Sequence, residues 1–174
     1  AAGRKPLAGR LAELVLLYFL VGGLALLLER RAGQIAPQGW EFYAVTGGVP
    51  KYIELFHDAD DVYAAIERNV LQRSSFLYDE PNFLLQNEVA EVGSYFSIIK
   101  AIAAGNRKLG SIASVLEQKQ SNLSKYLKTL IDLDILEREV PVTEEAPEKS
   151  KRGLYKIKDN FLLFWFRFVY PNLS

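Results

Sequence analysis

Three stretches of helical hydrophobic spacing, followed by two short alternating stretches, place the tightest limits on how this chain can fold. Between residues 91 and 132, apolar side chains recur three or four positions apart, as along one face of an amphipathic helix. Gly105 is suited to end the first helix, and Ser121 to cap the third. Because the last two helices are joined by a short turn, the pattern predicts a helix-turn-helix. The apolar positions are Tyr95, Ile98, Ile99, Ile102 and Ala103 in the first helix, Leu109, Ile112, Ala113 and Leu116 in the second, and Leu123, Tyr126, Leu127 and Leu130 in the third.

Two segments of alternating apolar and polar residues follow the third helix. They cover 135–140 and 154–158, and the polar stretch 143–153 between them carries Pro147 and Gly153. Such a pattern predicts a two-stranded β-hairpin with a long loop. Residues 90–159 are therefore predicted to form a winged helix-turn-helix domain. The competing interpretation is a generic helical bundle with an incidental hairpin.

Residues 37–89 have the pattern of a small acidic helical bundle. Residues 38–90 contain three Lys and Arg in total and nine Asp and Glu, so the segment is acidic. Gly47 and Gly48 supply turn geometry, and Pro50 can open the next helix because the first turn does not need its N–H. Asp58 is predicted to cap a further helix, and one more short helix is expected after Pro81. The expected fold class is mainly α, with this helical bundle followed by the winged-helix domain.

Two apolar segments raise the question of a membrane. Leu14–Leu28 is fifteen residues without a charge, but as a helix it reaches about 22 Å, less than the roughly 30 Å of a hydrocarbon core. We therefore predict no membrane partner, and expect a buried strand at 13–19 and a helix at 21–31. The aromatic helix expected at 160–174 is also too short to span, and we predict that it leads into a further domain. The alternatives for that helix are docking to a partner protein and anchoring at a membrane surface, and the second is disfavoured because only Arg167 gives the helix a polar face.

The outward side of the third predicted helix carries lysines and small polar groups. Twenty-one Lys and Arg balance twenty-one Asp and Glu in the whole chain, so a polyanion site has to be a local patch. Lysines suit phosphates, and short polar groups suit base edges, so the pattern predicts modest, salt-sensitive binding of duplex DNA. The alternative is a regulatory module whose third helix packs on another protein domain. The predicted DNA-binding residues are Lys119, Ser121, Asn122, Ser124, Lys125 and Lys128 on the helix, and Lys149, Lys151 and Arg152 in the hairpin loop, where Glu144, Glu145 and Glu148 balance them.

The sequence contains no complete active site. It has no Cys and a single histidine, His57, and it lacks the phosphate-loop, dinucleotide-binding, zinc-protease and hydrolase-elbow motifs. Residues 105–111 have the glycine spacing of a phosphate loop but no lysine before Ser111. We therefore predict that the chain is not catalytic by itself and binds no metal. A sequence without Cys fits a reducing cytoplasm, and because it begins with Ala-Ala-Gly and has no Met, we expect a part of a longer product.

Several motifs, in a consistent order, resemble the archaeal and bacterial P-loop ATPases of the AAA+/STAND type. The Gly-Gly-Val-Pro-Lys-Tyr and terminal aromatic motifs are the most specific. The motifs are Pro6-Leu7-Ala8-Gly9-Arg10, Tyr43-Ala44-Val45-Thr46-Gly47-Gly48-Val49-Pro50-Lys51-Tyr52, Ser124-Lys125-Tyr126-Leu127, Glu139-Val140-Pro141-Val142-Thr143, Leu154-Tyr155-Lys156-Ile157-Lys158-Asp159-Asn160-Phe161 and Phe164-Trp165-Phe166-Arg167-Phe168-Val169-Tyr170-Pro171-Asn172.

The resemblance implies a role for each part of the chain. Residues 1–36 would be the end of an ATPase core, 37–89 its helical lid, 90–159 the winged helix, and 160–174 the entry to a nuclease-like C-terminal domain. Arg10 would sense nucleotide phosphate. The parent family binds ATP and Mg²⁺ through residues upstream of this chain, so neither is expected to bind this chain alone. The lid would couple nucleotide state to DNA or partner binding.

Overall fold

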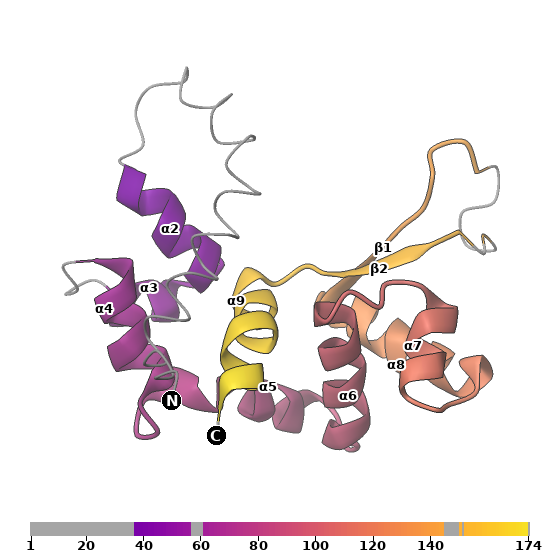
Figure 1. Cartoon of the computed structure of the whole chain (residues 1–174), viewed down its shortest axis with the longest axis horizontal. Helices are drawn as coiled ribbons and strands as arrows, with labels where there is room; N and C mark the ends of the chain where they lie inside the picture. The colour runs from indigo at the N-terminus through magenta and orange to yellow at the C-terminus, as the bar shows by residue number, and fades with distance from the viewer. Residues whose placement is uncertain (1–36, 57–60, 145–149, 151, 174) are drawn as a thin grey trace, which may run out of the picture. The chain divides into compact units, whose positions relative to one another are not determined.

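The computed structural model describes residues 37–56, 61–144, 150 and 152–173, with side chains from Trp40 onward. The described chain is mainly helical, with one small two-stranded antiparallel sheet (Figure 1). It forms two compact units, one of residues up to 79 together with 168–174, and one of residues 80–167. The predictions at 13–19 and 21–31, and those for Arg10 and Asp58, lie outside the described residues.

In the first unit, α2 (Pro37–Thr46) is followed by α3 (Pro50–Phe56) and α4 (Val62–Ile66). Two short helical turns follow, η2 (Glu67–Leu71) and η3 (Phe76–Tyr78), and η6 (Tyr170–Asn172) joins the unit from the chain's end. The predicted break after α2 is confirmed, since Gly47 has φ 64° and Gly48 has φ 79°, and Pro50 opens α3.

A carboxylate fixes where α4 begins. The Asp61 side chain accepts hydrogen bonds from the backbone N–H of Tyr63 at 2.8 Å and of Ala64 at 2.9 Å, so Asp61 caps this helix in the role predicted for Asp58. The Asn69 amide donates to the carbonyl oxygen of Leu55 at 2.7 Å and ties η2 to α3. Polar side chains therefore set the turns of this unit.

The second unit contains the predicted helices and hairpin. Its elements are α5 (Glu80–Glu88), α6 (Val92–Ala103), α7 (Leu109–Val115), α8 (Gln120–Asp132), β1 (Leu136–Glu139), β2 (Leu154–Ile157), α9 (Asn160–Phe164) and the start of η5 (Trp165–Val169). Gly105, with φ 98°, follows α6 as predicted. The prediction for Ser121 is wrong, because Lys119, two residues earlier, occupies the N-cap position and Gln120 is the first residue of α8. The unit begins at Glu80, because α5 packs on α6.

The core of this unit comes from one face of each helix and from the hairpin. Phe96 of α6 contacts Trp165, with ring centroids 6.0 Å apart, and Phe166, with centroids 4.6 Å apart. The aromatic residues that follow β2 are therefore packed against α6. Fully or almost fully buried side chains include Ile98, Ile99, Ile112, Leu123, Leu127, Leu130, Leu136, Ile157, Phe161 and Trp165.

The hairpin is joined to the loop between α6 and α7. Its antiparallel register pairs Leu136 with Ile157 and Glu139 with Leu154. The backbone N–H of Tyr155 donates to the carbonyl oxygen of Arg107 at 2.8 Å, and Arg107 Nε donates to the carbonyl oxygen of Tyr155 at 3.2 Å. The edge of β2 that does not pair with β1 is therefore hydrogen-bonded to Arg107, a residue 48 positions earlier in the chain.

Asp159 caps α9, and its loss should weaken the fold. Its Oδ1 accepts from the N–H of Leu162 at 2.7 Å. Asp159→Ala should therefore lower the free energy of unfolding by about 1 kcal/mol. Asp159→Asn should lose less, because Asn caps helices equally well. Urea denaturation of the two variants measures the difference, and equal losses would contradict the capping role.

The contribution of the Asp159 carboxyl to the free energy of unfolding should depend on pH. Burial raises the pKa of Asp159 above its ordinary value of 3.8, although hydrogen bonds from the backbone of Leu162 and Phe161 oppose the shift. The folded state therefore holds this proton more tightly than the unfolded state. The contribution of Asp159 to stability is largest below pH 3.8 and falls as the pH rises through the raised value.

Candidate nucleic-acid interface

Helix α8 has two different faces. Leu123, Leu127 and Leu130 are at most 3% exposed and face the core. The six residues predicted to contact DNA from this helix and its N-cap are all exposed. Ser121, Lys125 and Lys128 follow one another at helical spacing, so the structure brings them onto one stripe. The exposed set is Lys119, Ser121, Asn122, Ser124, Lys125 and Lys128.

Cations on α8 and cations on the hairpin have different surroundings. In the described part of the chain, no carboxylate forms an ion pair with Lys119, Lys125 or Lys128. On β2, Lys156 Nζ lies 2.9 Å from Glu137 and 3.5 Å from Glu139. Positive charge on the hairpin is thus largely balanced, while positive charge on α8 remains available to an outside anion.

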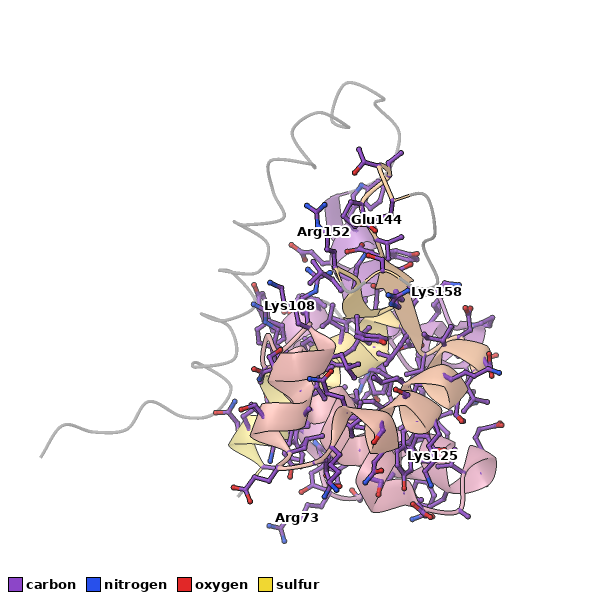
Figure 2. All side chains as sticks on the ribbon, turned by 90° about the vertical axis from the view of Figure 1, so that its right-hand side faces the viewer. Arg73, Lys108, Lys125, Glu144, Arg152 and Lys158 are labelled. Atoms are coloured by element: carbon purple, nitrogen blue, oxygen red, sulfur yellow. The ribbon has the colours of Figure 1, made fainter. Side chains whose placement is uncertain are left out.

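Of the hairpin-loop residues that were predicted to bind DNA, only Arg152 is described by the structure. Arg152 is exposed, but its guanidinium lies 3.5 Å from the Glu144 carboxylate. Figure 2 shows this pair well separated from Lys125. Lys149 and Lys151 lie outside the described residues. The structure therefore gathers the α8 residues of the predicted site and does not bring Arg152 to them.

Sequence reasoning missed a groove beside the exposed stripe. This open groove has a volume of about 680 Å³ and lies between the first half of α6, the turn before α8, and α8 itself. Its polar walls include Gly93, Ser94 and Ser97 from α6, and Ser121, Asn122 and Lys125 from α8. Ser94 and Ser97 are spaced one helical turn apart, which is the sequence signal that could have placed them on one side of α6.

Lys125 is held against its neighbour on α8. Its ammonium nitrogen lies 4.5 Å from the centroid of the Tyr126 ring, which is a cation–π distance. A side-chain hydrogen bond with Tyr126 is the main cause that raises the pKa of Lys125 above its ordinary value of 10.5, and electrostatic interactions with Tyr126 and with the Glu91 carboxylate add to it. Lys125 is therefore fully charged at neutral pH.

The glycine-spaced segment 105–111 does not fit a nucleotide phosphate. It follows α6 and runs into the first residues of α7, whereas a phosphate loop follows a strand. Ser111 Oγ is engaged with the backbone of Lys108, accepting from its N–H at 3.2 Å and donating to its carbonyl at 2.9 Å. Among the residues that the structure describes, no three His, Asp or Glu side chains come together as a metal site requires. Within the same residues, no helix is both long enough and apolar enough to cross a bilayer.

Comparisons with known proteins give two similarities. Residues 1–50 match the model of DUF2818, a family described as proteins of unknown function, and most of this match precedes the described residues. The chain is also 42% identical over 134 residues to an uncharacterized protein of Methanocaldococcus jannaschii. That alignment covers 77% of this chain and only 30% of the length of the archaeal protein. No solved structure matches the chain significantly.

Proposed function

We propose that residues 90–159, which lie within the compact unit 80–167, form a winged helix-turn-helix that binds duplex DNA through α8. The support for the fold is the order α6, α7, α8, β1, β2, with four residues, 116–119, between α7 and α8. Glu117 in that turn adopts φ 53°, a conformation that such turns commonly give to glycine. The hydrogen bonds between Arg107 and Tyr155 cover the outer edge of β2 with the loop before α7, which suits a compact wing.

One observation carries the proposed function: the exposed face of α8 presents three lysines with no ion-pair partner among the described residues. With α8 in the major groove, its lysines contact phosphates while Ser121 and Asn122 reach base edges. Ser124 Oγ donates to the carbonyl oxygen of Gln120 at 3.1 Å, so this hydroxyl serves DNA as an acceptor. The hairpin, whose cations are largely paired, contributes less.

The number of lysines predicts the salt dependence of binding. Three neutralised phosphates give a slope of about −2.7 in a plot of log affinity against log salt. Affinity should therefore fall by about 40-fold between about 50 and 200 mM salt. Fluorescence anisotropy with a labelled duplex measures this. Binding that ignores salt, or no binding at low salt, would contradict the proposal and favour the protein-interaction module.

The proposal extends to the parent protein that the family resemblance implies. In it, residues 37–89 act as the lid of an AAA+/STAND-type ATPase in the cytoplasm, and ATP and Mg²⁺ bind to a core that precedes them in the longer protein. The segment 105–111 offers no site for either. ATP with Mg²⁺ should therefore show no heat of binding to this chain in calorimetry, whereas a duplex should.

A further inference from the structure

The side chain that fixes Lys125 is itself fixed by α6. Tyr95 of α6 packs against Tyr126 edge to face, with ring centroids 5.0 Å apart and ring planes 79° apart. The Tyr126 hydroxyl donates a hydrogen bond to the carboxylate of Glu91, the residue just before α6. The ring of Tyr126 is therefore held in one orientation by contacts to two residues more than 30 positions away in sequence.

The fixed ring of Tyr126 limits the positions that the Lys125 ammonium can take. A lysine on a helix surface has a long flexible stem and loses much of its rotamer freedom when it grips a phosphate. An ammonium that already rests on a fixed aromatic face has lost part of that freedom before the phosphate arrives. Lys125 is exposed, so it remains accessible to an outside anion while the ring restricts where it can go.

We infer that Tyr126 is a positioning residue, which holds the Lys125 ammonium in a fixed place beside the groove and, through Tyr95 and Glu91, couples that cation to α6. The benefit to DNA affinity rests on the proposed function. The positioning itself exists in the free protein, so it can be measured without DNA.

The test compares Tyr126→Leu with Tyr126→Phe in the full chain. The first removes the ring, and the second keeps the ring and removes only the hydroxyl. By NMR of the free protein, the Lys125 ε-methylene protons should be shifted upfield by the ring current in the wild type and in Tyr126→Phe. The shift should vanish in Tyr126→Leu. Tyr63→Leu, which removes an exposed tyrosine from the other unit, is the matched control and should leave the shift in place.

Duplex binding supplies the second readout. Tyr126→Leu should weaken binding by about threefold to tenfold, as expected when one ordered side chain is released, while Tyr126→Phe should stay close to the wild type. In a Lys125→Ala background, Tyr126→Leu should cause no further loss, whereas a merely structural role would weaken binding again.

The outcomes separate the two claims. If the wild type lacks the ring-current shift, the positioning role is overturned, whatever the result with the duplex. If Tyr126→Leu loses the shift but binds DNA as tightly as the wild type, the benefit of this positioning to DNA affinity is overturned, and DNA binding by α8 stands. If the shift is present and no duplex binds, the positioning of Lys125 is supported and the proposed function fails.

Discussion

Replacing Trp165 by alanine should lower the free energy of unfolding of the 80–167 unit by about 3 to 5 kcal/mol, the usual loss for a large aromatic side chain removed from a core. Trp165 is only 1% exposed and packs edge to face against Phe96 and Phe166. The cavity that remains would lie where the end of α9 meets α6. Urea denaturation followed by far-ultraviolet circular dichroism measures the change.

Two further variants make this prediction specific. Trp165→Phe keeps a ring that can contact Phe96 and should lose clearly less than Trp165→Ala. Pro171→Ala changes an exposed residue just beyond the aromatic run and should have little effect. A loss below about 1 kcal/mol for Trp165→Ala would mean that the aromatic residues after β2 do not form part of the core.

Removing two lysines from α8 should have the largest effect on binding. Lys125→Ala combined with Lys128→Ala eliminates two phosphate contacts and should reduce duplex affinity on the order of 60-fold near 0.1 M salt. The slope of log affinity against log salt should become less negative by about 1.8. Anisotropy titrations at several salt concentrations give both quantities. Since both side chains are exposed, the fold should remain intact.

The hairpin provides a charge-matched control. Lys156→Ala combined with Lys158→Ala also removes two positive charges, but Lys156 is paired with Glu137 and Glu139, and Lys158 Nζ lies 2.6 Å from Asp134. This variant should bind DNA within a few-fold of the wild type, because its lysines are already balanced. An equal loss of duplex affinity in both double variants would indicate a general effect of net charge. It would contradict the proposal that α8 is the DNA-binding helix.

The local features of the fold could be predicted from the sequence because they depend on neighbouring residues. Leucines at 123, 127 and 130 mark the inner face of α8, glycines at 47 and 48 mark a turn, and the alternation at 154–158 marks β2. The start of a helix depends on more than its neighbouring residues. Lys119, Gln120 and Ser121 are all polar, and only the folded backbone decides which of them occupies the N-cap of α8.

Contacts between residues far apart in the chain could not be predicted from the sequence. Nothing in the local pattern pairs Arg107 with Tyr155, or Tyr126 with Glu91, because those contacts depend on how the helices pack. The sequence placed Arg152 and Glu144 in one loop, but it could not show that these two residues form an ion pair. Most of the apolar residues after Asp159 are buried, but the sequence could not show that Phe96 is one of the residues that they pack against.

The central claim is that the exposed face of α8 contacts duplex DNA, and mapping the contact by NMR tests it most directly. Backbone amide resonances of the full chain are followed while an unlabelled duplex is added at low salt. We predict that the largest shift changes fall on residues 119–128 and on the facing polar residues of α6, Ser94 and Ser97. Changes confined to other surfaces, or no changes at saturating duplex, would contradict the account.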